Sequence, residues 1–200
     1  MSRPSILGFA GSASKPSKTR TLVEKIVADT AGRYHETARV YDILDFGAAL
    51  GLARKLDDLD AQARAVVDDI VNAKALVVAT PVYKGSYPGL FKHLIDLLDP
   101  ATLAGKPILL AATGGGEKHA LVIEHQLRPL FAFFEAQTLG TGIYVSDRDF
   151  ENEVLTNPAV LDRIGRAVGQ FEPHLGASDA NVVDNIVTDW AEPKSAVAGR

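Results

Sequence analysis

The chain has 200 residues, 46% of them hydrophobic, and a formal net charge of −4, which together predict one compact domain with a sizeable core. It contains no cysteine, and this excludes disulfides, thiolate catalysis and iron–sulfur clusters. The sequence has no basic stripe with interleaved aromatics, so we expect no nucleic-acid partner. It also has no secretory leader and no apolar run of roughly 20 residues, so we expect no membrane association and a cytoplasmic location.

The first loop of the chain has the side chains of an anion site. An apolar run at 6–10 predicts a buried strand, and the pattern from about 17 to 32 predicts a helix. Hydroxyls, free backbone N–H groups and the positive end of a helix dipole together suit a phosphate monoester. The polar side chains of the loop and the first helical turn are Ser12, Ser14, Lys15, Ser17, Lys18, Thr19, Arg20 and Thr21. The alternative is an ordinary strand-to-helix turn in which Ser17 caps the helix.

Two other phosphate-binding loops do not fit this segment. A Walker A loop that starts at Gly11 would need glycine where Pro16 stands and lysine where Ser17 stands. The dinucleotide fingerprint also fails, because Gly8 and Gly11 are too far apart and no third glycine follows. A loop that holds phosphate with hydroxyls and backbone amides remains.

Strands and helices alternate along the rest of the chain. Further strands are predicted at 37–43, 75–80, 107–112 and 138–145, and helices at about 59–73, 88–98, 117–134 and 158–171. The apolar strand at 75–80 shows no alternation, which is typical of a parallel central strand. We therefore predict an α/β fold with a doubly wound, parallel, five-stranded sheet of order 2-1-3-4-5. We expect this domain to span 1–175, with 176–200 as a poorly ordered tail or a segment that docks on a neighbouring subunit.

Two more loops follow predicted strands at the edge where ligands bind in such a sheet. The loop at 80–89 offers a flat aromatic, Tyr83, together with a rigid backbone and free amides. The loop at 113–116 contains three glycines, which allow the backbone to approach a ring closely. Each loop alone is compatible with an ordinary surface turn. Three such loops at one edge favour a planar, nucleotide-like ligand.

These three segments resemble the NAD(P)H-dependent FMN reductases, and in particular the reductase partners of alkanesulfonate and methanesulfonate monooxygenases. The resemblance covers roughly 5–175 and is most specific at 81–84, Pro-Val-Tyr-Lys, with Gly-Leu-Phe-Lys at 89–92. It implies a flavodoxin-like fold, a dimer or tetramer, and FMN and NAD(P)H as ligands.

The resemblance also implies where FMN binds. The FMN phosphate would lie on Ser12, Ser14, Ser17, Lys18 and Thr19. The isoalloxazine would lie against Pro81, Val82, Tyr83, Lys84 and Gly85, with Thr113, Gly114, Gly115 and Gly116 beside it. The family often has arginine where Ser14 stands, and the weaker charge here agrees with a flavin that must depart. Hydride transfer needs no side-chain acid or base, so no catalytic residue is predicted.

The predicted helix at 117–134 has two unusual features. Its apolar residues cover too much of the circumference for one core-facing stripe, which predicts a subunit interface: Leu121, Val122, Ile123, Leu127, Leu130, Phe131, Phe133 and Phe134. Pro129 clashes with the carbonyl of His125 and predicts a kink or π-bulge. The related sulfonate-linked reductases have a π-type insertion at the position that matches His125. We hypothesise that His125 lies at the interface and affects flavin exchange; the alternative is a structural histidine.

The histidines do not suggest a metal site. None of the five shows a known ligand spacing: His35, His93, His119, His125 and His174. His119 and His125 are six residues apart, which would place them on different faces of a regular helix, and we expect His119 to begin that helix.

We interpret the chain as an NAD(P)H-dependent FMN reductase that supplies reduced FMN to a two-component sulfonate monooxygenase. One alternative is a reductase that retains its FMN and reduces quinones or azo compounds. Another is a flavodoxin-like electron carrier, although such carriers tend to be more acidic than this chain with its net charge of −4.

Overall fold

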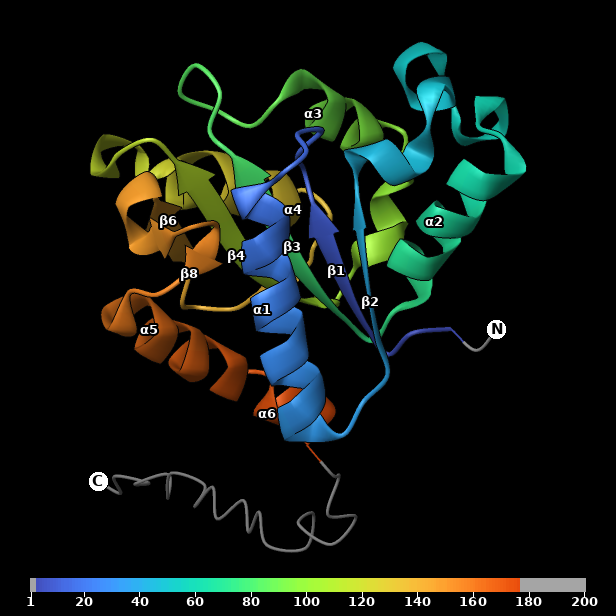
Figure 1. Cartoon of the computed structure of the whole chain (residues 1–200). Helices are drawn as coiled ribbons and strands as arrows, with labels where there is room; N and C mark the ends of the chain where they lie inside the picture. The colour runs from blue at the N-terminus through green and yellow to red at the C-terminus, as the bar shows by residue number, and fades with distance from the viewer. Residues whose placement is uncertain (1–2, 177–200) are drawn as a thin grey trace, which may run out of the picture.

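The computed structural model describes residues 3–176. Its main sheet is parallel and has the order β2-β1-β3-β4-β5, with β6 also paired with β4 (Figure 1). The strands are β1 Ile6–Ala10, β2 Ala38–Asp42, β3 Ala75–Pro81, β4 Pro107–Gly114, β5 Gln137–Thr138 and β6 Ile143–Ser146. The predicted flavodoxin-like order is confirmed, with the fifth predicted strand divided into β5 and β6. The predicted tail falls outside the described residues from position 177 onward.

Helices cover both faces of the sheet, as predicted (Figure 1). The α-helices are α1 Lys18–Tyr34, α2 Ala61–Asn72, α3 Gly89–Asp96, α4 Arg128–Ala132, α5 Pro158–Gly169 and α6 Glu172–Leu175. Short 3-10 turns span Ile43–Phe46, Ala48–Leu52, Leu56–Asp58, Pro100–Leu103, Glu117–His119 and Asp147–Asp149. Apolar side chains of α1 and α5 form the core on one face, and those of α2, α3 and α4 form the core on the other. None of the helices in the described part of the chain has the length and apolarity needed to cross a bilayer.

Three phenylalanines connect the core to the first loop. The ring of Phe9 on β1 stacks on Phe91 of α3 at a centroid distance of 5.9 Å and meets Phe46 edge-on at 6.0 Å. Phe91 also lies directly under Gly11, where an added Cβ would meet its Cδ2 at 2.5 Å. The ring of Phe91 therefore supports the loop that follows β1.

The division of the fifth strand has a local cause at Gly142. A Cβ there would meet Cγ2 of Ile123 at 2.7 Å, so the chain passes closely under the helical segment that contains Ile123. The Thr141 N–H donates to the Gln170 side chain, and Arg163 donates to the Gly142 carbonyl, instead of completing the ladder with β4. This excursion separates β5 from β6.

The predicted helix at 117–134 is not continuous, and this is a correction. A 3-10 turn, Glu117–His119, is followed by a π-helix, Ile123–Leu127, and then by the short α4. The Arg128 N–H donates to the Ile123 carbonyl, five residues back. Because Pro129 has no N–H to donate and its ring excludes the usual geometry, the helix opens before it. The predicted opening is confirmed, and it takes the π form.

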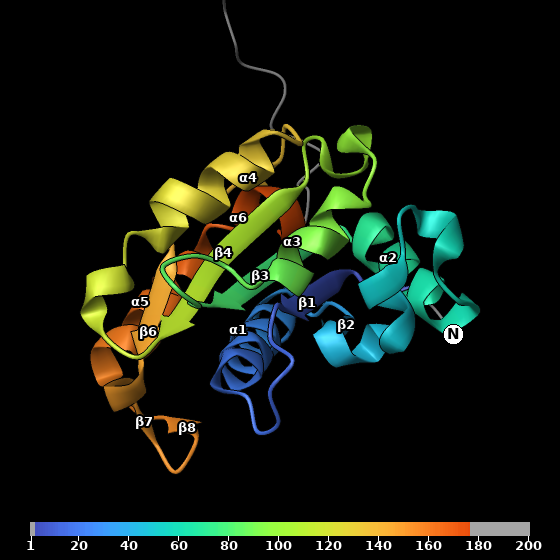
Figure 2. The same ribbon diagram turned by 90° about the horizontal axis from the view of Figure 1, so that it is seen from above.

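A small antiparallel hairpin follows β6 and was not predicted. It pairs β7, Phe150–Glu151, with β8, Val154–Leu155. Two-residue strands carry too little alternation to be recognised in a sequence. Figure 2, viewed from above, shows this hairpin projecting beside the loop that joins β1 to α1.

Candidate functional site

A cavity of about 310 Å³ lies at the carboxyl ends of the strands. All three predicted loops contribute to it, and Figure 2 looks down on this edge of the sheet. The predicted residues that line it are Ser12, Ser14, Ser17, Lys18, Thr19, Pro81, Val82, Tyr83, Thr113, Gly114 and Gly115. The parallel topology thus brings together segments that are about 100 residues apart in the chain.

Three predicted residues lie outside this lining. Lys84 and Gly85 have positive φ angles of 52° and 87° and form the exposed tip of a two-residue turn. The turn is closed by backbone hydrogen bonds between Tyr83 and Ser86, at 2.8 and 3.1 Å. Gly116 uses its carbonyl to accept a hydrogen bond of 2.6 Å from the Tyr144 hydroxyl.

The beginning of α1 forms the polar end of the cavity. Ser17 caps the helix, and its Oγ accepts the Arg20 N–H at 3.2 Å. The backbone N–H groups of Lys18 and Thr19 donate to no group within residues 3–176. These free donors and the helix dipole favour an anion. The capping role of Ser17 and a role in anion binding are therefore compatible, because the Ser17 hydroxyl hydrogen is still free.

Two threonines close the floor beneath this end. The hydroxyls of Thr19 on α1 and Thr113 on β4 lie 2.7 Å apart, and both side chains are buried. One hydroxyl donates to the other, which leaves a single O–H hydrogen for a ligand. Ser12, also buried, accepts the Ser14 N–H and retains its own hydroxyl hydrogen.

Lys18 and Arg20, the two cations at the start of α1, already have carboxylate partners. Lys18 Nζ donates to Asp147 Oδ1 at 2.7 Å across the cavity. Arg20 pairs with buried Asp42 at 2.7 Å and with Glu24 at 2.8 Å. Burial lowers the pKa of the Arg20 guanidinium, but Asp42 and Glu24 raise it by more, so Arg20 stays charged. An anion at this end would rely on hydroxyls and amides more than on unpaired cations.

Several lining residues were missed by the sequence reasoning. They are Pro16, Val145, Ser146, Asp147, Phe150 and Glu153. A signal existed for those near position 146, because they follow the fifth predicted strand and so had to lie at the same edge. Phe150 and Glu153 lie on the unpredicted hairpin, and no sequence pattern pointed to them.

Asp149 holds the segment after β6 in place. Its carboxylate accepts the Ser146 N–H and hydroxyl, each at 2.7 Å, and the Asn157 amide at 2.6 Å. Burial raises the pKa of the Asp149 carboxyl, but the hydrogen bonds from Asn157 and Ser146 lower it by more, so its pKa lies below the usual range. Asp149 therefore stays ionised near neutral pH and fixes the rim that carries Asp147.

Gly114 lines the cavity and also makes room for a protein side chain. A Cβ on Gly114 would meet the Tyr144 hydroxyl at 2.4 Å, so any side chain at this position would displace Tyr144 or the loop. Burial raises the pKa of Tyr144, and the charges of Asp147 and Asp149 raise it further, so its hydroxyl stays protonated and donates to Gly116.

The opposite wall presents an open aromatic surface. Tyr83 is 51% exposed, and its hydroxyl lies 3.4 Å from the Ser14 hydroxyl across the mouth of the cavity. Pro81 and Val82 continue this wall beneath it. The cavity thus has an anion-binding end at α1 and a flat, partly apolar wall, which fits a phosphorylated ring system such as FMN. The hydroxyls, free N–H groups and flat wall of this cavity can bind and orient such a ligand.

A family model described as NADPH-dependent FMN reductase matches residues 4–151. The chain belongs to this family. It is therefore an oxidoreductase that uses FMN and NAD(P)H, and the function class and ligands implied by the resemblance are confirmed.

Named relatives agree with this assignment. The reductase is 43% identical over 171 residues to an "FMN reductase (NADPH)" of Pseudomonas aeruginosa, which covers 86% of this chain and 92% of the relative. It is 42% identical to "NADH-dependent FMN reductase SfnF" of Pseudomonas fluorescens, covering 88% of this chain and 95% of the relative. Among solved structures, the apo form of an NADH:FMN oxidoreductase (EMOB) is similar with a TM-score of 0.78 and 31% identity, covering 88% of this chain and 92% of that one.

Proposed function

We propose that this reductase transfers hydride from NAD(P)H to exchangeable FMN and releases reduced FMN to a flavin-dependent monooxygenase of sulfonate metabolism. The three loops that carry the resemblance to sulfonate-linked reductases meet around one cavity. The two carboxylates in its lining, Asp147 and Glu153, support an exchangeable flavin.

In this proposal the FMN phosphate occupies the α1 end of the cavity. The free N–H groups of Lys18 and Thr19 and the hydroxyls of Ser12 and Ser17 would hold it. The isoalloxazine would lie along the wall of Pro81, Val82 and Tyr83, with the loop of Gly114 and Gly115 beside it. FMN held there would supply the hydride acceptor, and the protein would contribute orientation and electrostatics.

Two carboxylates in the lining favour release of the flavin. Asp147 and Glu153 face the same cavity as the proposed phosphate donors. Asp147 also pairs with Lys18, so a phosphate dianion must share this cation with it. Like charges at short range weaken binding of an anion.

Steady-state oxidation of NADH and of NADPH, with and without added FMN, tests the proposal. We expect dialysed protein to be colourless and oxidation to require free FMN. Protein that stays yellow after dialysis and shows ping-pong kinetics toward quinones would instead favour a flavin-retaining reductase. Absence of NAD(P)H oxidation with FMN present would contradict the proposal altogether.

Ser17→Ala tests the proposed phosphate end. The variant should bind FMN about 10- to 100-fold more weakly, because a hydrogen bond to a charged group contributes about 1.5–3 kcal/mol. Riboflavin, which lacks the phosphate, should bind as it does to the wild type. Loss of the N-cap should also reduce the free energy of unfolding by about 1 kcal/mol.

Asp60→Ala is the matched control for the stability effect. Asp60 caps α2, and its side chain accepts the Ala63 N–H at 2.8 Å, far along the sequence from the cavity loops. It should lose similar stability without a change in FMN affinity. Equal FMN affinity in Ser17→Ala and Asp60→Ala would argue against a phosphate at Ser17.

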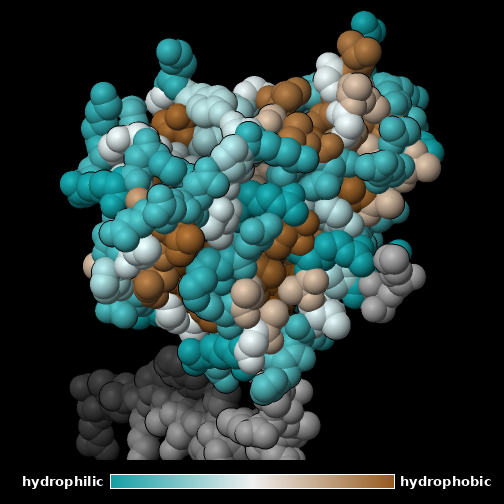
Figure 3. All heavy atoms as spheres, viewed as in Figure 1, coloured by the Kyte–Doolittle hydropathy of each residue, from teal (hydrophilic) through white to brown (hydrophobic). Residues whose placement is uncertain are grey.

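We also propose that the reductase is a homo-oligomer, a dimer or tetramer, whose interface includes the helix near His125. An apolar groove of about 530 Å³ runs between α3 and α4, and Phe133 beside it is 69% exposed. The groove is lined by Lys92, Ile95, Asp96, Leu98, Pro100, Leu130, Phe133 and Phe134. The face that carries α1 and α5 is mostly hydrophilic, with only small separate apolar areas (Figure 3). An exposed phenylalanine at an apolar groove is typical of an interface.

Phe133→Glu should dissociate this oligomer, because a carboxylate cannot be buried there without a partner. Light scattering should give the mass of a monomer for the variant and a multiple of it for the wild type. Leu52→Glu is the control, since Leu52 is 87% exposed on the 3-10 turn Ala48–Leu52 and should leave the mass unchanged. A monomeric wild type would contradict the proposed interface. A separate variant, His125→Ala, tests whether this histidine affects FMN exchange.

A further inference from the structure

A second, smaller cleft opens next to the cavity already described. Its volume is about 200 Å³. The residues that line it are Gly85, Lys118, His119, Leu121, Val122, His125 and Gln126. Among the described residues this lining includes one lysine and two histidines but no aspartate or glutamate. The flavin cavity, in contrast, contains Asp147 and Glu153.

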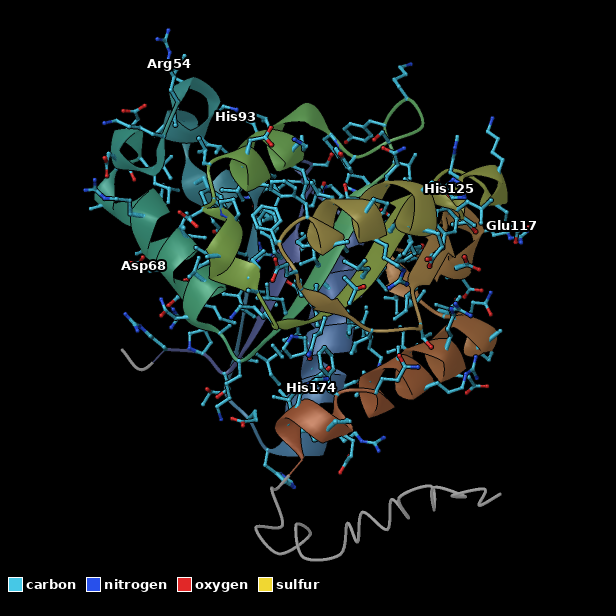
Figure 4. The ribbon with its side chains drawn as sticks, turned by 180° about the vertical axis from the view of Figure 1, so that it is seen from behind. Arg54, Asp68, His93, Glu117, His125 and His174 are labelled. Atoms are coloured by element: carbon cyan, nitrogen blue, oxygen red, sulfur yellow. The ribbon has the colours of Figure 1, made fainter. Side chains whose placement is uncertain are left out.

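The irregular helix explains why these basic side chains meet. A regular helix would place His119 and His125 on different faces, and that expectation was wrong. His119 ends the 3-10 turn Glu117–His119, and His125 belongs to the π-helix Ile123–Leu127, so the helical phase is interrupted between them. Figure 4 shows His125 and Glu117 at the same end of this segment.

The acidic residues nearest in sequence do not line the cleft, and both are paired with arginines. Glu117 forms an ion pair with Arg148, and Glu124 accepts two hydrogen bonds from Arg128 at 2.6 and 3.0 Å. Lys118, by contrast, is exposed and forms no ion pair within residues 3–176. Within residues 3–176, the charge of Lys118 therefore has no carboxylate partner in direct contact.

One more donor faces the cleft. The Gln126 Oε1 accepts the Ser86 hydroxyl at 3.1 Å, which orients its amide and leaves the NH₂ group free to donate. Lys118, His119, His125 and Gln126 together offer N–H donors from two consecutive helical segments. Such donors bind the oxygens of a phosphate.

The cleft and the flavin cavity share one short turn. Tyr83 lines the cavity and Gly85, two residues on, lines the cleft. Two residues span at most about 7 Å of extended chain. A dinucleotide whose nicotinamide lies over a ring at Tyr83 would carry its phosphates toward this turn, since one ribose joins its nicotinamide to the diphosphate.

We infer that the cleft of Lys118, His119, His125 and Gln126 binds a phosphate group of NAD(P)H. The inference rests on the proposed function, because it requires the nicotinamide to lie over FMN in the neighbouring cavity. FMN itself has a separate anion site at α1, so the two phosphate-bearing ligands use different ends of the rim. Lys118 provides the charge, and the histidines and Gln126 provide directed donors.

Calorimetric titration of NADP⁺ and NAD⁺ into FMN-saturated protein tests this assignment. Lys118→Glu should weaken NADP⁺ binding about tenfold or more, as expected for loss of a hydrogen bond to a charged group and introduction of a like charge. Lys118→Arg should retain most of the affinity. Lys55→Ala is the control, because Lys55 is an exposed lysine that already pairs with Asp57. In steady-state assays the KM for NADPH should rise while kcat stays near the wild-type value.

The two nucleotides distinguish the phosphates. An equal loss for NAD⁺ and NADP⁺ assigns the diphosphate to the cleft, and a loss confined to NADP⁺ assigns the 2′-phosphate. Unchanged affinities for both nucleotides in Lys118→Glu, with FMN-dependent oxidation intact, would overturn the inference and leave the proposed function standing. Wild-type protein that fails to bind FMN would instead contradict the proposed function.

Discussion

Gly114→Ala is expected to weaken FMN binding by about 5- to 150-fold. The added Cβ would meet the Tyr144 hydroxyl at 2.4 Å. Gly114 ends β4, so the backbone itself tolerates alanine, and the cost comes from overpacking, typically about 1–3 kcal/mol. Because Gly114 lines the cavity, a shift of its loop that relieves this clash would displace the wall proposed to lie beside FMN. The cost therefore falls mainly on binding, which flavin fluorescence titration measures.

A second substitution should rescue this variant. Tyr144→Phe removes the hydroxyl, and the nearest ring atom, Cζ, would then lie 3.3 Å from the new Cβ. The double variant should regain most of the lost affinity, although it lacks the bond of 2.6 Å to the Gly116 carbonyl. Gly165→Ala is the control, because a Cβ there meets nothing within 4 Å. If the single variant Gly114→Ala bound FMN with wild-type affinity, the assigned role of this glycine would be contradicted.

Phe91→Ala is expected to lower the free energy of unfolding by about 3–5 kcal/mol. Phe91 is fully buried, stacks on Phe9, and supports Gly11 from below. Its removal leaves a cavity between α3 and the sheet. Since a domain of this kind is stable by about 5–15 kcal/mol, the loss is a large share of the total. Urea denaturation without flavin measures it.

Two further variants make this result specific. Phe91→Leu should lose less stability than Phe91→Ala, because it fills part of the space. Leu52→Ala should change stability by no more than about 0.5 kcal/mol, since Leu52 is 87% exposed. A loss below about 1 kcal/mol in Phe91→Ala would show that the core closes around the missing ring. It would contradict the expectation that Phe91 supports the loop that follows β1. FMN affinity of the variant provides an independent measure of that support.

Local patterns were sufficient for most of the fold. The apolar runs at 6–10 and 75–80 match β1 and β3 closely, because a strand buried on both faces needs an uninterrupted apolar sequence. The stripes of α1 and α2 were also predictable, since a helix that covers a sheet repeats its apolar residues every three or four positions. Pro129 revealed the break in its helix, because a proline in the interior of a helix cannot donate the regular backbone hydrogen bond.

The same reasoning failed where distant segments set the local structure. The fifth strand divides because Gly142 passes under Ile123, and no pattern within 138–145 records that contact. The close approach of Gly114 and Tyr144 was not predicted, because Tyr144 lies 30 positions further along the chain. The pairing of Asp147 with Lys18 was not predicted, because it joins residues 129 positions apart.

The sequence by itself determined the parallel order of the strands and the edge at which the three loops meet, because period and turn chemistry are local properties that fix a doubly wound sheet. It also determined the family, through short segments in those loops. Only the tertiary structure decided which charges face each other: it set Asp147 against Lys18, and it brought His119 and His125 into one basic cleft. Whether two charged groups interact depends on their distance in space. Spacing along the chain does not give that distance for residues on distant segments, nor for two residues of one helical segment that has lost its regular period.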